Sequence, residues 1–573
     1  GLVEPSYAAP ARVVVSNTVM PYVFSGGSIT TPLVRKAGTG SLTRVDGGAD
    51  VVGELELNEG AYVSSNSYDA TFASVLSDAS AGLGTFGKQG PGTLTITSTN
   101  SSYDGAIVIE HGVLKVGAEG ALGSTNGTVT ILPGATLDVN DIQSPQKPVI
   151  ASGAGFNGQG AITESSGVAG VQHNLTDVTL VGDTTFGCAP NGRWDIRVRT
   201  GSGIGPGLRG NGYKLTKVGA GTVSIACQRH FGTNTPYWDM NLGDVLIAEG
   251  MLTFAESLSP GNPTHSITIA PGAILNTYDL NVTNPIVREI FMTDAQISSG
   301  GTAGDTNVYT GTIHLTGAGH FRVNSGTRLF INGPIVGSGA VNYSDAGAGM
   351  LVLNATNTYS GDTTVTNGTL AGGASIAGNL VMLGGTLAPG EGVGVFKVGG
   401  DATLGGTTRM ELAPGQTQNS DRLDVGGNLV LGGALEVVLA PGAANPVAGE
   451  VFQLFGKAGA GSFTSVSLPD LSALPGGLSW NTNDLYVTGA ISVVASAAPS
   501  IGAVALSGTD FIFSGTGGVE GATYYVLRST NVAAPSSHWT PVATNVFGPG
   551  GVFSYTNAIT PAVPESFFRL QIP

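Results

Sequence analysis

Short runs of alternating residues recur along almost the whole chain. In residues 351–373, for example, Leu351 and Leu353 flank Val352, and further along Thr363 and Val365 flank Thr364. Period-two runs of this length are typical of short β-strands rather than helices. Gly, Asn, Ser and Asp fill the positions between the runs, and these residues favour tight turns. The pattern therefore predicts short strands joined by corners, with almost no room for a helix.

The same strand-and-corner cassette recurs at three places. It begins as KQGPGTLTITS at Lys88, as KVGAGTVSIAC at Lys217 and as DAGAGMLVLNA at Asp345, and the second copy resumes at Leu242 after an insertion. Internal self-similarity is the sequence signature of a solenoid, because a single coil of short strands cannot bury its own apolar side. Stacked coils share one core through strands about 4.8 Å apart. We therefore predict an all-β fold built around a parallel β-helix, with Leu, Val and Ile inside and Thr and Asn outside.

These cassettes resemble a known family of repeats. The copy at 345–370 closely resembles the autotransporter-associated β-strand repeat, and the copies at 88–114 and 217–252 resemble it more loosely. That repeat is found in right-handed parallel β-helices of secreted bacterial proteins. Residues 477–494, GLSWNTNDLYVTGAISVV, resemble the last coil of such passengers. The resemblance covers roughly residues 40–494 and implies right-handed coils and a secreted, extracellular or cell-surface location.

The pattern changes after a small-residue hinge at 496–500. From Ile501 it predicts six short strands, at VALSG, DFIFSG, TYYVLRST, WTPVATN, GVFSYTN and FFRLQIP. Strands of this number and length fit a small antiparallel β-sandwich. This part also resembles the C-terminal domain of many secreted proteins of Verrucomicrobia, which implies sorting or surface attachment. The predicted domains are an N-terminal cap at 1–35, the parallel β-helix at 36–495 and the β-sandwich at 496–573.

Composition indicates a buried interior beneath a surface that is polar but sparsely charged. Charged residues make up 11% of the chain, against about 25% in a typical soluble domain. Hydrophobic residues reach 41%, so the chain is not a disordered tract of low hydrophobicity. The net charge of −16 argues against nucleic-acid binding, which needs basic patches. No apolar run reaches about 18 residues, so we expect no membrane span.

The densest cluster of charge lies at residues 191–214. Strand alternation places its arginines and Asp195 on one face and Trp194 on the other. The simplest interpretation is a solvated cationic strand face. The alternative is a patch that binds an anionic glycan or a protein partner. The candidate contact residues are Arg193, Trp194, Arg197 and Arg199.

A second cluster, CQRHFGTNTPYWDMN at 227–241, interrupts the cassette that starts at Lys217. Its aromatic side chains could stack on sugar rings. Equally, the insertion could be a loop that packs its aromatics back against the wall of the β-helix. The candidate binding residues here are His230, Phe231, Tyr237 and Trp238.

Cys188 and Cys227 are the only two cysteines of the chain. They could form a disulfide, or they could be two small buried thiols on unrelated strands. The sequence leaves both alternatives open. No spacing of His, Cys, Asp and Glu predicts a metal site, and we expect no cofactor.

These observations favour a protein without catalytic activity, because catalytic β-helices need carboxylates clustered on one face. The first hypothesis is a secreted structural protein that self-assembles head-to-tail into an extracellular filament or cell-surface fibre. The open ends of a β-helix can accept strands from another copy, and a contact of that kind need not close. The alternative is a monomeric surface adhesin or glycan-binding protein, and the third is a polysaccharide lyase or hydrolase. The expected partners are copies of the chain itself and cell-surface or matrix polysaccharide.

Overall fold

The computed structural model describes most of the chain, and every element in it is a strand or a short turn. Its three helical elements are single 3-10 turns, η1 (Phe156–Gly158), η2 (Ser536–His538) and η3 (Pro549–Gly551). None of the described segments forms a helix long and apolar enough to cross a bilayer. The described residues are 12–18, 21–25, 33–45, 54–78, 84–99, 102–143, 147–170, 175–197, 207–226, 238–256, 258–280, 284–345, 347–471, 474, 477–495, 499–560 and 565–572.

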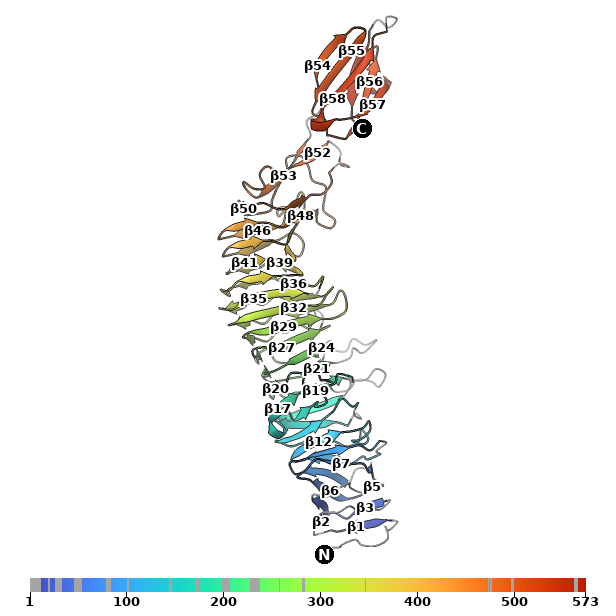
Figure 1. Cartoon of the computed structure of the whole chain (residues 1–573), viewed down its shortest axis with the longest axis vertical. Helices are drawn as coiled ribbons and strands as arrows, with labels where there is room; N and C mark the ends of the chain where they lie inside the picture. The colour runs from blue at the N-terminus through green and yellow to red at the C-terminus, as the bar shows by residue number, and fades with distance from the viewer. Residues whose placement is uncertain are drawn as a thin grey trace. The chain divides into compact units, whose positions relative to one another are not determined.

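The chain divides into two compact units. Residues 1–391, 395–408 and 425–433 form the first unit, and residues 392–394, 409–424 and 434–573 form the second. The first unit consists of short parallel strands stacked in ladders, each strand pairing with its equivalents in the coils before and after it (Figure 1).

Four sets of strands illustrate these ladders. One set contains two ladders: β9 (Gly84–Gln89), β11 (Ala106–Ile109) and β13 (Val129–Ile131) form one, and β10 (Thr93–Ile96), β12 (Gly112–Val116) and β14 (Ala135–Asp138) form the other. A second set is β20 (Leu215–Val218), β23 (Val245–Ile247), β26 (Ile267–Ile269), β28 (Ile290–Met292), β31 (Ile313–Leu315) and β34 (Ile335–Gly337). A third set is β18 (Arg193–Arg197), β21 (Thr222–Ala226), β24 (Met251–Ala255), β27 (Ile274–Tyr278), β29 (Ala295–Gly300), β32 (Ala318–Val323), β35 (Ala340–Asp345) and β38 (Thr363–Val365). A fourth set is β30 (Thr306–Tyr309), β33 (Arg328–Ile331), β36 (Met350–Leu353), β39 (Thr369–Gly372) and β42 (Thr386–Pro389).

The core of the first unit is a set of columns in which every coil contributes one aliphatic side chain. Along the ladder from β23 to β31, Val245, Ile267, Ile290 and Ile313 lie opposite one another in successive coils, and all are buried. Burying such a side chain is worth about 1.5–3 kcal/mol. The intervening position of each strand points outward, as Thr268 does. The parallel β-helix predicted from the alternating pattern is confirmed.

The second unit begins with a parallel pair and then turns antiparallel. β48 (Ala434–Leu439) pairs in parallel with β51 (Ser465–Ser467), whereas β53 (Ala490–Ala495) pairs antiparallel with both β49 (Val451–Gln453) and β52 (Leu478–Asn481). Residues 477–494, which resemble the last coil of passengers, form a hairpin. The physical cause is a tight turn, in which the carbonyl oxygen of Asp484 accepts hydrogen bonds from the amides of Val487, Thr488 and Gly489.

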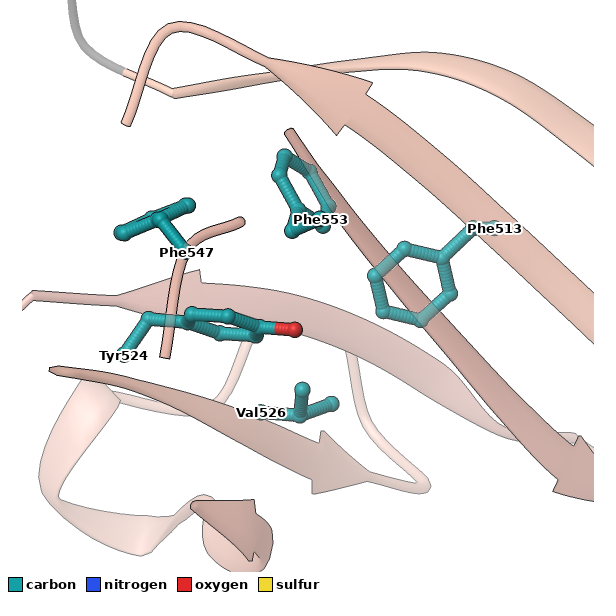
Figure 2. Close-up of a cluster of buried hydrophobic side chains, with 5 residues drawn as sticks. All are labelled: Phe513, Tyr524, Val526, Phe547 and Phe553. Atoms are coloured by element: carbon teal, nitrogen blue, oxygen red, sulfur yellow. The ribbon is translucent and has the colours of Figure 1, made fainter. Parts of the chain in front are cut away.

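The chain ends in the predicted β-sandwich of two three-stranded antiparallel sheets, ordered β54–β55–β58 and β57–β56–β59. Figure 2 shows five of its side chains, Phe513, Tyr524, Val526, Phe547 and Phe553, converging between the sheets. All six predicted strands are confirmed. They are β54 (Ser500–Ser507), β55 (Asp510–Thr516), β56 (Thr523–Ser529), β57 (Thr540–Val546), β58 (Phe553–Ala558) and β59 (Phe567–Gln571).

Candidate functional site

The arginine-rich segment forms β18 at the start of the third set of strands. Arg193 makes a two-point ion pair with Asp195, with Nε 2.8 Å from Oδ1 and Nη2 2.9 Å from Oδ2. Asp195 is fully buried, whereas the side chain of Arg193 keeps about a third of its surface exposed. The guanidinium therefore serves to neutralise a buried carboxylate of its own strand.

The prediction that Trp194 is a contact residue for a ligand or partner is wrong, because its side chain is not accessible. Its side chain is fully buried, and its indole Nε1 donates a hydrogen bond to the carbonyl oxygen of Gly187 at 2.8 Å. Its ring packs edge-on against Phe186, with centroids 5.1 Å apart. The alternation of β18 is as predicted, so the tryptophan face is the face that packs into the core.

The other described arginines of this region are paired with carboxylates of other coils. Arg197 forms an ion pair with Glu256, and Arg209 lies 2.7 Å from Asp177 and also donates to the hydroxyl of Thr179. Each carboxylate belongs to a different coil from its arginine. The predicted cationic face is therefore neutralised in place, which leaves little free charge for an anionic ligand.

Most residues of the aromatic cluster lie outside the described part of the chain. This holds for His230, Phe231 and Tyr237, and Arg199 of the arginine-rich segment also lies outside it. The role of these four residues in binding stays a prediction. Trp238 begins the short strand β22 (Trp238–Asp239), which pairs in parallel with β25 (Leu258–Ser259).

Cys188 carries a free thiol and is buried. Its sulfur lies 3.8 Å from the carboxylate of Glu164. Burial, and then the negative charge of Glu164, raise the pKa of the Cys188 thiol to about 12, so this thiol is unreactive near neutral pH. Cys227, the other half of the disulfide alternative, lies outside the described residues.

A feature that the sequence interpretation missed is the lysine that begins the cassettes. Lys88 is fully buried, and its ammonium donates to three backbone carbonyl oxygens: those of Gln89 at 2.8 Å, Gly90 at 2.7 Å and His111 at 3.1 Å. The first two belong to its own corner and the third to the corner of the next coil. The ammonium is therefore a donor shared by the carbonyl oxygens of two successive corners, and the carbonyl of Gln89 also accepts from the backbone amide of Asn66 at 3.2 Å.

Lys217 repeats this arrangement in the second cassette. Its ammonium donates to the carbonyl oxygens of Val218 at 2.9 Å, Gly219 at 2.6 Å and Glu249 at 3.2 Å. Burial lowers the pKa of both Lys88 and Lys217 to about 8. With three carbonyl oxygens around each ammonium, these lysines are structural clamps between coils rather than nucleophiles.

Lys36 makes the same clamp earlier in the chain, with oxygens of Ala37, Gly38 and Glu59. The shared signal is a lysine two residues before the first glycine of the G-x-G corner, seen as KAGTG, KQGPG and KVGAG. The cassette at 345 has an aspartate instead. There the Asp345 carboxylate accepts the amide hydrogen of Gly349, and its carbonyl accepts from Asn367 at 3.0 Å.

The described charged residues thus act mainly between coils. Within the part of the chain that the structure describes, no group of three His, Cys, Asp or Glu side chains is placed to hold a metal ion.

Comparisons with known proteins find a matching repeat family and a solved structure of low similarity. No curated protein matches the chain. Among solved structures, the crystal structure of the Haemophilus influenzae Hap adhesin aligns at 13% identity with a TM-score of 0.25, over 82% of this chain and 64% of the adhesin chain. This chain therefore spans under two thirds of that adhesin. Residues 86–116 and 345–371 match the family model of the passenger-associated-transport repeat, so two of the three cassettes recognised above are passenger-type repeats.

Proposed function

We propose that this chain is a secreted, non-enzymatic structural protein of the bacterial surface whose copies assemble head-to-tail into a filament or fibre. Two passenger-type repeats support a place outside the cell or on its surface. The main support for the proposal is that the charged side chains make structural contacts between coils. In a chain with 11% charged residues, Lys88, Lys217, Arg197 and Arg209 are all engaged in contacts between coils.

The strand edges of the first unit support assembly. β1 (Val13–Ser16) pairs with β3 (Leu33–Ala37), and β2 (Tyr22–Ser25) pairs with β4 (Ser41–Val45). Their other edges pair with no described strand, and Val14 and Val23 are about half exposed. Strand edges with exposed apolar side chains favour pairing with another chain. A contact between two different surfaces of successive copies would extend without closing.

The experiment for this proposal is electron microscopy of native secreted material, combined with sedimentation of the purified chain. We expect filaments in the first and large, concentration-dependent species in the second. Single particles in both would overturn head-to-tail assembly. Hydrolysis or cleavage in a screen of pectin, alginate and sulfated glycans would overturn the non-enzymatic assignment.

One observation favours an adhesin as second candidate. On the outer face of the β-helix, Phe291 of β28 and His314 of β31 stack with ring centroids 4.4 Å apart and planes 7° apart. Phe291 is 39% exposed, and Glu289 lies 3.6 Å from His314. A flat, partly exposed aromatic surface beside a polar group is suited to stacking on a sugar ring.

For the adhesin, we expect Phe291→Ala to weaken binding of surface polysaccharide at least tenfold on a glycan array. The matched control is Tyr68→Ala, which removes a ring that is 74% exposed and that stacks on no other ring among the described residues. Equal binding by both variants, or no glycan binding by the parent chain, would contradict this candidate.

A further inference from the structure

The edge strand β54 of the C-terminal sandwich presents aliphatic side chains that stay open to solvent. Among the described strands it pairs with β55 alone. All eight of its residues are exposed. The large ones, Ile501, Val504 and Leu506, are 43%, 61% and 70% exposed.

Two of these side chains stand at positions that face the core. Val504 lies opposite Phe513 and Leu506 lies opposite Phe511 in the β54–β55 pair. Directly opposite residues of an antiparallel pair share a face of the sheet. Phe513 is part of the buried cluster of Figure 2, and Phe511 packs against that cluster. β54 therefore carries core-type residues at core-facing positions without the burial that such positions normally give.

A β-bulge brings the third aliphatic residue to the same face. The pairing register shifts between Ile501 and Ala503, so that Ile501 lies opposite Gly515 while Ala503 lies opposite Ser514. Ile501 and Val504 are three residues apart, so in a regular strand their side chains would point to opposite faces of the sheet. One extra residue between them brings both side chains to the same face. With Gly502 as that extra residue, all three large aliphatic side chains point to one side and the alanines to the other.

The other edges of the sandwich carry features that discourage strand pairing, and β54 does not. β57 contains Pro541 and β59 contains Arg569. β58 is largely polar along its length, with the sequence FSYTNA. β54 has the sequence SIGAVALS, which has no charge and no proline over eight residues. An exposed, apolar and uncharged edge of this length is a template for another strand.

The sequence of β54 is complementary to itself. Without the bulged Gly502 it reads Ser-Ile-Ala-Val-Ala-Leu-Ser, which is the same from either end apart from the exchange of Ile for Leu. An antiparallel pair of two such strands, centred on Val504, places valine against valine. It also places Ile501 of each copy against Leu506 of the other, and alanines against alanines. No charge is brought together, and every aliphatic side chain gains an aliphatic neighbour.

We propose that two copies of this chain pair through β54, antiparallel and two-fold symmetric about Val504, so that two three-stranded sheets become one six-stranded sheet. Such an isologous contact closes at two copies. The inference goes beyond head-to-tail assembly, because it links two chains, or two filaments, through their sandwiches. The occupant is a second copy because an uncharged palindromic edge matches itself in length, charge and side-chain order.

The first test is a symmetric cross-link in the full-length chain. Val504→Cys is introduced together with Cys227→Ser, while the buried Cys188 is retained. At the two-fold axis, opposite Cα atoms of an antiparallel pair lie about 4.5–5.5 Å apart, within the range of about 4.4–6.8 Å that a disulfide spans. We expect mild oxidation to give a covalent dimer on a denaturing gel.

The matched control is Val532→Cys in the same background, because Val532 is 64% exposed and lies between β56 and β57 rather than on a strand. Cross-linking of the Val504 variant but not of the control supports the pairing. Equal cross-linking of both variants, or none in either, overturns it. This cross-link tests the pairing of β54 independently of filament formation, because the disulfide forms between two sandwiches in either case.

A second measurement uses charge instead of a bond. Val504→Lys places two ammonium groups opposite each other and should weaken dimerisation at least tenfold in sedimentation, whereas Val532→Lys should leave it unchanged. Filaments that persist in electron micrographs of the Val504→Lys variant while pairing is lost would support both proposals. A parent chain without any sandwich pairing would overturn this inference and leave head-to-tail assembly standing.

Discussion

Replacing Gly112 by alanine will destabilise the β-helix by about 4 kcal/mol, one of the two largest effects we expect from a single substitution. Gly112 begins β12 with a φ of +76°, a conformation that costs a residue with a Cβ roughly 1–2 kcal/mol. An added Cβ would also overlap the carbonyl oxygen of Gly90 and lie 2.8 Å from that of Gly92. These carbonyls belong to the coil before, so the clash is relieved only by parting two coils.

The control for this substitution is Gly134→Ala. Gly134 has a φ of +88°, and an added Cβ would meet nothing within 4 Å. It shares the backbone strain of Gly112 but not the contact with a neighbouring coil, so we expect a loss of about 1 kcal/mol. Urea unfolding followed by far-ultraviolet circular dichroism measures both. Equal losses at the two glycines would show that coils are not packed as closely as the structure has them.

Replacing Lys88 by methionine will cost about 3 kcal/mol at neutral pH. Methionine keeps the length and apolar stem of the side chain but removes the donor shared by the carbonyl oxygens of Gln89, Gly90 and His111. The carbonyl oxygens of Gly90 and His111 would lose this donor, whereas that of Gln89 keeps the backbone amide of Asn66 at 3.2 Å. Leaving a polar group without a partner costs about 1–3 kcal/mol, and relief from burying a charge offsets part of this. The control is Lys397→Met, at an exposed position, for which we expect a change within about 0.5 kcal/mol.

The same lysine predicts how stability changes with pH. Because burial lowers the pKa of Lys88 to about 8 from an unfolded value near 10.5, the unfolded chain binds more protons between these two values. The free energy of unfolding should therefore rise as pH increases from about 8 to about 10. Lys217 and Lys147, whose pKa values burial also lowers to about 8, contribute with the same sign.

Above this window the sign reverses. Burial raises the pKa of Tyr309 and Tyr359 well above the usual value of 10, so the folded chain retains protons that the unfolded chain loses.

The rise in the free energy of unfolding between pH 8 and 10 should be smaller in the Lys88→Met variant than in the parent chain. An unchanged rise would mean that Lys88 is not buried as a cation at neutral pH.

The strands of both units were predictable because alternation directly reports which face is buried. The run at 351–353 lies in β36, that at 363–365 is β38, and all six sandwich strands appear where apolar alternation and turn residues placed them. The position of each strand depends on residues that are close together in the sequence, and a single sequence shows such local patterns directly.

The candidate site was less predictable because its partners are remote in sequence. Arg197 and Glu256 are 59 residues apart, and Arg209 and Asp177 are 32 apart. Each pair meets only because the coils are stacked, with Asp177 one coil from Arg209 and Glu256 two coils from Arg197. Alternation placed Trp194 on the face opposite the arginines, and that face is buried, but it did not predict that Asp195 on the arginine face is buried as well. A binding patch that includes Trp194 is wrong, because this side chain packs in the core.

The buried lysines were missed for a different reason. Lysine is normally a surface residue, so Lys88 and Lys217 attracted no attention although they begin two cassettes at equivalent positions. Their position two residues before the G-x-G corner was the available signal. Its meaning becomes clear only when three carbonyl oxygens of two coils are seen around each ammonium.

Charged side chains in this chain fasten one coil to the next. Hydrogen exchange read by mass spectrometry tests this contact most directly, on the parent chain and on Lys88→Met and Lys217→Met. We expect slow exchange in the ladders of the parent, faster exchange near residues 84–116 in the first variant, and faster exchange near 215–226 and 245–251 in the second. Exchange that is unchanged in both variants, or equally raised along the whole β-helix, would contradict it.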